Sequence, residues 1–265
     1  MAAVCVVLLR APSASEKDKY HRELMSKGYV PYSIPVLSFE FENLDRLAET
    51  LHQPQSHGGM IITSPRSVEA IELSISKYIP KEKWLEVLQK QWQDLHLFAI
   101  GDATSTAMKN KLGLQSCGYQ SGSAEKLVPI IKQVITAGNQ PLLFPCGNLR
   151  RETIPQEMKN AGIKLTSVEV YKTIPNPEIQ SALQEHIKTK GLPDVIVFFS
   201  PSGLEFTIDF IKDIMGDLST IKLVAIGNTT SQALHNKGLS VAGVAEKPNP
   251  ESLCQCIQKC CPTSG

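Results

Sequence analysis

The sequence predicts an α/β protein with parallel sheets that is built from two similar halves. Short apolar runs alternate with helical stretches along the 265 residues, which is the pattern of open parallel sheets covered by helices. Two segments also recur in the same order. "MIITSPRSVEAIE" (60–72) is echoed by "IVFFSPSGLEFTI" (196–208), and "AIGDATSTAMKNK" (99–111) by "AIGNTTSQALHNK" (225–237). This internal duplication predicts two domains of one architecture.

The first repeated segment predicts a buried strand, a turn and a helix. An apolar run leads into Ser-Pro in both copies, at Ser64 and at Ser200. Serine is a preferred N-cap residue, and proline suits the first helical position because the N–H that it lacks would have no helical partner there. We therefore expect Ser64 and Ser200 to cap the two helices.

The second repeated segment has the same organisation. "LFAIG" and "LVAIG" predict strands, and Asp102 or Asn228 is expected to cap the helix that follows. Hydroxyl side chains occupy the first turn of each predicted helix, at Thr104, Ser105, Thr229, Thr230 and Ser231.

Two weaker pairings complete the duplication. Residues 4–40 and 141–173 both read as strand, loop, helix, glycine and strand, and the opening apolar run predicts a buried first strand rather than a signal peptide. The segments 122–131 and 249–257 each begin with a cap and predict a last helix.

The repeat by itself allows tandem domains or one domain nested within the other. The stretches "PVLSFEFENL" (35–44) and "VYKTIPNPEI" (170–179) flank the central half of the chain, and both are rich in β-formers and proline. This favours nesting, with the two stretches as antiparallel linkers lying side by side.

Composition excludes several classes of function. The 27 Lys and Arg residues nearly balance the 26 Asp and Glu residues, so no global charge argues for nucleic acid or a membrane surface, although a local basic cleft for an acidic ligand remains possible. The histidines and seven cysteines lack metal-ligand spacing, which favours reduced thiols and no metal.

Dinucleotide, P-loop and hydrolase motifs are missing, and Cys146 is read as a buried thiol rather than a nucleophile.

Candidate binding residues gather at the predicted strand-to-helix junctions. Ligands of open α/β sheets bind beyond the carboxyl ends of the strands, where helix N-termini direct amide groups outward. Two facing domains would line one cleft with donors suited to a ligand that carries many carboxylates; these residues are Ser64, Thr104, Ser200, Ser202, Thr229 and Thr230. Ordinary helix capping would require the same residue types. The phenol of Tyr171 could face this cleft as a proton donor or pack at the hinge.

Six stretches in this order resemble the uroporphyrinogen-III synthase family in its animal form: "PVLSFEF", "ITSPRSVEA", "LLFPCGNLRRE", "VEVYKT", "FFSPSGL" and "AIGNTT". The resemblance implies two flavodoxin-like domains joined by a two-stranded linker, with one domain formed by residues 1–37 and 174–265 and the other by residues 38–173. It implies closure of the linear tetrapyrrole hydroxymethylbilane, with loss of water and inversion of the last pyrrole, without cofactor or metal. We expect orientation to supply most of the catalysis.

The resemblance also implies roles for particular residues. Tyr171 falls on the tyrosine proposed to assist departure of the hydroxyl group, and the six hydroxyl residues fall on positions that bind substrate carboxylates. Arg66 and Arg150 are further candidate anion contacts. Position 66 is Arg where the equivalent position of the other half is Ser202, and position 103 is Ala where the equivalent position is Thr229. The two halves are therefore not interchangeable.

The resemblance further implies a cytosolic monomer in heme biosynthesis that accepts its substrate by transient hand-over from the preceding deaminase. The alternative from another class is a two-domain hinge-type module that binds a small molecule without catalysis. Turnover that depends on Tyr171 would distinguish the enzyme from the binding module.

Overall fold

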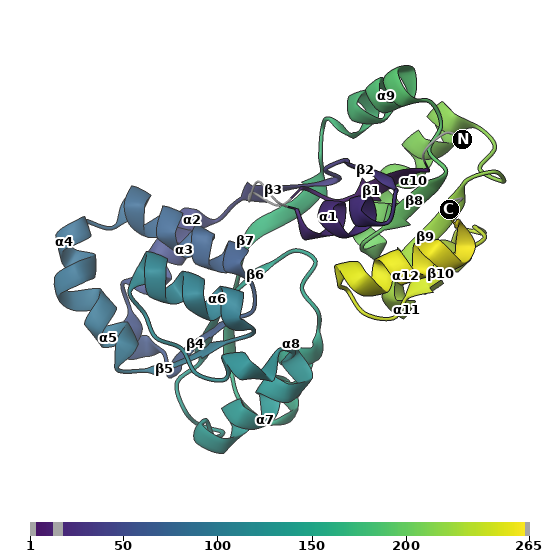
Figure 1. Cartoon of the computed structure of the whole chain (residues 1–265). Coiled ribbons are helices and arrows are strands. Elements are labelled where there is room, and N and C mark those ends of the chain that lie inside the picture. The colour runs from purple at the N-terminus through teal and green to yellow at the C-terminus, as the bar shows by residue number, and fades with distance from the viewer. Residues whose placement is uncertain (1–3, 13–17, 263–265) are drawn as a thin grey trace. The chain divides into compact units, whose positions relative to one another are not determined.

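The computed structural model describes residues 4–12 and 18–262 (Figure 1). The chain divides into two compact units. Unit 1 comprises Met1–Ser38 and Ile174–Gly265, and unit 2 comprises Phe39–Thr173. Each unit is organised around one five-stranded sheet.

The sheet of unit 1 has the strand order β10-β9-β8-β1-β2, and its paired strands are parallel. Its strands are β1 (Cys5–Leu9), β2 (Val30–Ser33), β8 (Val195–Phe198), β9 (Lys222–Ile226) and β10 (Gly243–Ala245). Its helices are α1 (Lys19–Ser26), α9 (Ile179–Lys190), α10 (Pro201–Met215), α11 (Gly227–Asn236) and α12 (Pro250–Cys260). The described part of the predicted first strand is therefore confirmed as β1; Met1–Ala3 lie outside the described residues.

The sheet of unit 2 has the order β3-β7-β6-β4-β5. Its strands are β3 (Leu37–Phe41), β4 (Gly59–Ile62), β5 (His96–Ala99), β6 (Leu142–Gly147) and β7 (Leu165–Pro175). Its α-helices are α2 (Leu44–Leu51), α3 (Pro65–Tyr78), α4 (Lys81–Lys83), α5 (Gln89–Gln93), α6 (Asp102–Ala107), α7 (Ala124–Val134) and α8 (Thr153–Asn160). Short 3₁₀ turns η1 (Pro54–Ser56) and η4 (Tyr119–Ser121) and π-helical turns η2 (Trp84–Leu88) and η3 (Met108–Leu112) complete it.

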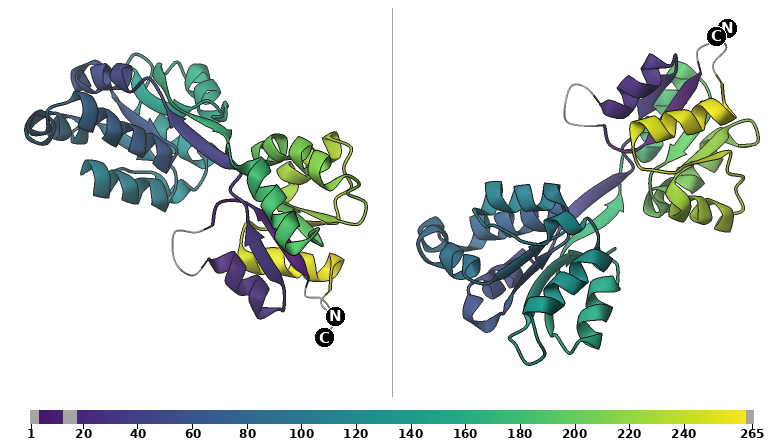
Figure 2. Two further views of the ribbon diagram at one scale, coloured as in Figure 1. Left: turned by 90° about the horizontal axis from the view of Figure 1, so that it is seen from above. Right: turned by 60° about the horizontal axis from the view of Figure 1, so that its bottom comes forward.

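Strands β3 and β7 lie side by side (Figures 1 and 2). The amide of Glu42 donates to the carbonyl of Val170, and the amide of Asn176 donates to the carbonyl of Val36. The residue numbers rise on one strand as they fall on the other, so this pair is antiparallel. The extended, paired conformation predicted for residues 35–44 and 170–179 is confirmed at these strands.

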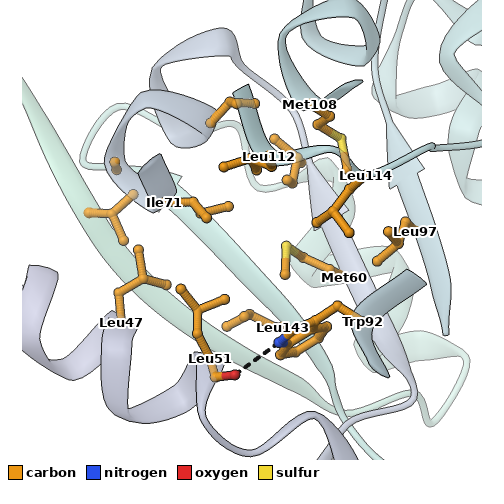
Figure 3. Close-up of a cluster of buried hydrophobic side chains, with 14 of the residues drawn as sticks. Leu47, Leu51, Met60, Ile71, Trp92, Leu97, Met108, Leu112, Leu114 and Leu143 are labelled. Carbon is orange, nitrogen blue, oxygen red and sulfur yellow. Dashed lines mark hydrogen bonds between the residues drawn. The ribbon is translucent and has the colours of Figure 1, made fainter. Parts of the chain in front are cut away.

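Helices cover both faces of each sheet, and each face has its own apolar cluster. Met60 and Ile62 of β4 contribute to the cluster drawn in Figure 3, where Trp92 donates its indole N–H to the carbonyl of Leu51 at 2.9 Å. Ile61, between them, packs into the cluster beneath α7 and α8 on the opposite face. Successive side chains of a strand point to opposite faces, so strands buried on both sides need uninterrupted apolar runs. Burial on both faces therefore explains the short apolar runs from which the strands were predicted.

The strand-to-helix junctions follow the predicted organisation with one correction. Ser64 and Ser200 are the N-caps of α3 and α10, as expected. Asp102 and Asn228 do not cap their helices, and that prediction was wrong. The N-cap of α6 is Gly101, with φ at 79°, and α11 begins at Gly227, with φ at 74°. A glycine with positive φ turns the chain from strand to helix without a side-chain cap.

The two weaker pairings are also confirmed. Strand, helix, glycine and strand follow one another as β1, α1, Gly28 and β2, and again as β6, α8, Gly162 and β7. Ser123 and Asn249 are the N-caps of α7 and α12. No helix among residues 4–12 and 18–262 is long and apolar enough to cross a membrane.

Candidate active site

The Ser-Pro junctions place two serine hydroxyls at the carboxyl ends of central strands. The Ser64 hydroxyl oxygen accepts from the amide of Arg66 at 3.1 Å, and the Ser200 hydroxyl oxygen accepts from the amide of Gly203 at 3.0 Å. The hydroxyls of Ser200 and Ser202 lie 3.2 Å apart. A capping hydroxyl serves as acceptor toward the helix and keeps its own hydrogen for another partner. Capping and ligand binding are therefore compatible at both serines.

The threonines of the second repeat differ sharply in exposure. Thr104 and Thr230 occupy equivalent positions in the first turns of α6 and α11, and each is only 2% exposed. Thr229, one residue earlier, is exposed, and its counterpart in unit 2 is Ala103. The side chains that these first turns expose are therefore Asp102 and Ala103 in unit 2 and Asn228 and Thr229 in unit 1.

Unit 2 contains a pocket of about 330 Å³ where β4, β5 and β6 end, and we refer to it as the unit 2 pocket. Its lining includes Ser64 and Tyr171 from the predicted site, and also Arg150. The other lining residues are Thr63, Ile100, Gly122, Ser123, Ala124, Phe144, Gly147, Leu149, Arg151, Ile154 and Thr173. The structure therefore brings together three groups that lie far apart in the sequence.

Cationic groups line one side of this pocket. Arg150 and Arg151 follow β6, where the amide of Arg150 closes a turn by donating to the carbonyl of Gly147 at 3.2 Å. Arg150 pairs with the carboxylate of Glu152, whose oxygen lies 3.5 Å from Nε, and this Nε atom is buried without a hydrogen-bond partner. The guanidinium group of a pocket-lining arginine is suited to a carboxylate ligand.

The N-terminus of α7 forms another part of the pocket. Ser123 caps this helix by accepting from the amide of Lys126 at 3.4 Å. The carboxylate of Glu125 accepts from its own backbone N–H at this helix end and from the Ser123 hydroxyl, and these contacts lower its pKa. The end of the helix therefore already stabilises one carboxylate, as expected from its amide donors and dipole.

Tyr171 lies on β7, half-buried at the edge of the pocket. Its ring meets Phe39 edge-on, with 6.2 Å between ring centroids, and it packs against the apolar cluster of Figure 3. The ring of Tyr171 therefore packs against the core and also lines the pocket, and its role as a proton donor stays a prediction.

Two other nominated residues are engaged elsewhere. The guanidinium of Arg66 pairs with Glu69 at 2.5 Å and lies over the Phe39 ring, 4.3 Å from its centroid. Arg66 does not line the pocket. Cys146 is 1% exposed, its thiol donates to the carbonyl of Val168 at 3.6 Å, and burial raises its pKa. It is a buried thiol, as the sequence predicted.

Sequence reasoning missed Ser123 and Arg151 as pocket residues. Both belong to segments that it had recognised for other reasons, the cap in "GSAEK" and the pair of arginines in "GNLRRE". Only the sheet order, which places β6 beside β4, shows that these segments meet Ser64. Within the described ranges, 4–12 and 18–262, no three His, Cys, Asp or Glu side chains are grouped so as to hold a metal ion.

Fold and site define a class: an internally duplicated α/β protein of two sheets, with a cation-lined pocket at the carboxyl ends of the strands in unit 2. Residues 18–255 match the family model described as uroporphyrinogen-III synthase HemD. The chain therefore belongs to the uroporphyrinogen-III synthase family.

Individual relatives agree with this assignment. The chain is 27% identical to the uroporphyrinogen-III synthase of Saccharomyces cerevisiae, over 95% of each protein. It is 25% identical to that of Chlorobaculum parvum, over 75% of this chain and 78% of the relative. The structure of the Helicobacter pylori enzyme has the same fold, with a TM-score of 0.61 at 17% identity, covering 95% of this chain and 96% of that one. A mutant of the Thermus thermophilus enzyme gives a TM-score of 0.57 at 18% identity, covering 97% and 98%.

Proposed function

We propose that the protein catalyses the reaction of its family, closure of hydroxymethylbilane to uroporphyrinogen III with loss of water and inversion of ring D, in heme biosynthesis. The observation that carries this proposal is the family match over residues 18–255. The unit 2 pocket supports it, because a substrate with eight carboxylates requires cationic and hydrogen-bond donors of the kind found there.

Tyr171 is the proposed catalytic residue. Departure of the terminal hydroxyl group breaks a C–O bond, the electron pair leaves with the oxygen, and a proton is needed to complete the water molecule. A phenol at the pocket edge donates a hydrogen bond to the departing oxygen and so lowers the cost of the charge that develops on it. The electron-rich pyrrole drives the same departure, so a weak acid is sufficient.

The remaining residues are proposed to orient the chain of pyrroles through their carboxylates. In unit 2 these are Ser64, Arg150 and the amides at the start of α6 and α7. In unit 1 they are the half-buried Ser200 and Ser202 and the exposed Thr229. Thr104 and Thr230 are buried in the first turns of α6 and α11 and are proposed to contribute through the backbone of those turns, and Arg66 is proposed to contribute by covering Phe39. Holding the reacting carbons in the geometry that leads to ring D inversion is the main catalytic task.

We further propose that the enzyme is a cyclising hydro-lyase that works without cofactor or metal, as a cytosolic monomer supplied by transient hand-over from a deaminase. The chemistry supports cofactor independence. The pyrrole nitrogen lone pair can expel the hydroxyl group, and the neighbouring pyrrole carbon can attack the resulting cation, so neither step changes the total oxidation level.

An isomer assay tests the proposed function. Hydroxymethylbilane is generated freshly from porphobilinogen with its deaminase, this protein is added, and the products are oxidised and separated as uroporphyrins I and III. We expect the product to change from isomer I to isomer III in proportion to the protein added, equally in the presence of a chelator. Isomer I alone, from protein with a folded circular-dichroism spectrum, would refute the enzymatic function. Loss of isomer III on chelation would refute metal independence alone.

A further inference from the structure

Gly147 lies directly against the ring of Tyr171. The two residues are partners on the parallel strands β6 and β7. A methyl group placed on the Cα atom of Gly147 would lie 2.5 Å from both Cε2 and Cζ of Tyr171 and 2.9 Å from its hydroxyl oxygen. Carbon atoms in van der Waals contact are about 3.5–4.0 Å apart. Any side chain at position 147 would therefore displace the phenol by about 1 Å.

The backbone at position 147 does not itself require glycine. Its φ angle lies outside the positive region occupied by Gly101, Gly113 and other glycines of this chain. An alanine could adopt this conformation without backbone strain. The demand for a residue without a Cβ atom thus comes from the Tyr171 ring alone.

The chain around Gly147 is held in place from the Tyr171 side. The pairing of β6 with β7 shifts between Cys146 and Gly147, which brings Gly147 opposite Tyr171. The backbone N–H of Asn148 then donates to the carbonyl of Tyr171 at 3.1 Å. The side-chain oxygen of Asn148 accepts from the backbone N–H of Thr173 at 2.9 Å. These two hydrogen bonds bracket Tyr171, so the strands cannot separate easily to make room for a side chain.

The opposite side of the ring is also occupied. Phe39 meets Tyr171 edge-on, and the Arg66 guanidinium covers Phe39. The ring of Tyr171 is therefore confined between the bare Cα of Gly147 and the packed side chains of β3 and α3. A displaced ring has to move along the pocket, and its hydroxyl group moves with it.

From this geometry we propose that Gly147 is a positioning residue for the reaction, because its missing side chain sets the place of the Tyr171 hydroxyl group in the unit 2 pocket. The inference rests on the proposed catalytic role of Tyr171. A misplacement of about 1 Å can lower a rate by up to about 100-fold while the fold and substrate binding persist. Gly147→Ala should therefore lower kcat 10- to 100-fold, with KM changed less than threefold.

The matched control is Gly243→Ala. Gly243 also lies on a strand without positive φ, and a methyl group there would lie 2.6 Å from the Cys256 sulfur in unit 1. This variant introduces the same substitution and a similar crowding away from every residue of the proposed site. It should keep kcat within twofold of wild type.

Two measurements make the test specific. A double-mutant cycle compares kcat for Tyr171→Phe, Gly147→Ala and the combined variant, each with freshly generated hydroxymethylbilane. Because both single changes remove the same hydrogen bond, the combined variant should be no slower than Gly147→Ala. In protein labelled with ring-¹³C tyrosine, the resonance assigned through Tyr171→Phe should shift in Gly147→Ala and not in Gly243→Ala.

The outcomes separate the two hypotheses. If Tyr171→Phe lowers kcat while Gly147→Ala leaves both kcat and the Tyr171 resonance at wild-type values, the positioning role of Gly147 is refuted and the catalytic role of Tyr171 stands. Fully additive losses in the combined variant also refute it, because the two residues then act independently. If Tyr171→Phe keeps full kcat, the catalytic role fails first and the positioning role fails with it.

Discussion

The two units share a scaffold, and in each an arginine follows an equivalent strand: Arg10 follows β1 and Arg150 follows β6. The two arginines have different surroundings. In unit 1, Arg10 follows β1, pairs with the nearly buried Asp18 at 2.8 Å and lies over the rings of Tyr20 and Phe199. In unit 2, Arg150 follows β6 and lines a pocket with its Nε atom lacking a hydrogen-bond partner. Arg10 is thus engaged with a nearly buried carboxylate of its own unit, whereas Arg150 pairs with the exposed Glu152 and lines a pocket.

Each unit also has a tyrosine whose surroundings differ in the same way, packed in unit 1 and lining the pocket in unit 2. Tyr20 of unit 1 packs against Phe199 and Arg10, whereas Tyr171 of unit 2 reaches the pocket across a bare glycine. The two units thus share one architecture, and individual side chains distinguish the packed region of unit 1 from the pocket of unit 2. A substrate without symmetry requires such a difference.

The largest expected effect concerns the two tyrosines. Tyr171→Phe should lower kcat about 10- to 100-fold, because general-acid assistance to the leaving hydroxyl group is lost. Tyr20→Phe should leave kcat unchanged. Single-turnover measurements with fresh hydroxymethylbilane, together with titration of tetrapyrrole binding, check both variants. An equal loss of kcat in both would remove the functional difference between the units.

The second comparison concerns the arginines. Arg150→Gln should raise KM about 5- to 10-fold, since a charge-assisted contact to a carboxylate contributes on the order of 1.5 kcal/mol, and should leave the free energy of unfolding nearly unchanged. Arg10→Gln should lower the free energy of unfolding by about 2 kcal/mol, because it removes the ion pair with the nearly buried carboxylate of Asp18. Steady-state kinetics and urea titrations of both variants give the two quantities. An unchanged KM in Arg150→Gln would contradict the assignment of the unit 2 pocket as a carboxylate site.

The capping serines should be more alike. Ser64→Ala and Ser200→Ala each remove a side-chain bond to a helix amide and should each lower the free energy of unfolding by about 1 kcal/mol. Urea titrations measure this loss, and the corresponding Gly variants should recover most of it, because glycine is a tolerated N-cap. If one serine proved far more important than the other, the units would differ in scaffold as well as in site.

A further difference concerns alkaline pH and distinguishes the units by their thiols. Burial, with a smaller contribution from Asp194, raises the pKa of Cys5 to about 11, and burial raises that of Cys256 to about 11; both belong to unit 1. A pKa raised in the folded state means that the neutral thiol is favoured there, so its stabilising contribution is present below pH 9 and is lost between about pH 9 and 11. Urea midpoints should fall more between pH 8.5 and 10.5 in wild type than in a Cys5→Ala/Cys256→Ala variant. An identical fall in both would exclude these thiols as its cause.

Local signals in the sequence located the duplicated strands and helices and gave their order. Buried parallel strands require uninterrupted apolar runs, and helix starts require particular caps, so β4, β8, α3 and α10 could be located from local chemistry. The duplicated order of motifs then implied two sheets of one design. Asp102 and Asn228 were misplaced as caps because a glycine with positive φ can replace a side-chain cap, and sequence pattern does not distinguish the two devices.

Tertiary structure alone decided the site. Ser64, Ser123, Arg150 and Tyr171 come from four separate segments, and they meet only because β4, β6 and β7 are neighbours in the sheet of unit 2. The hydrogen bonds of an arginine and the exposure of a threonine both depend on neighbours that are remote in the chain. Likewise, Gly147 must lack a side chain because of a ring that lies across the strand pair, and backbone preference does not reveal this. Local chemistry builds the elements, and contacts between distant segments assign their functions.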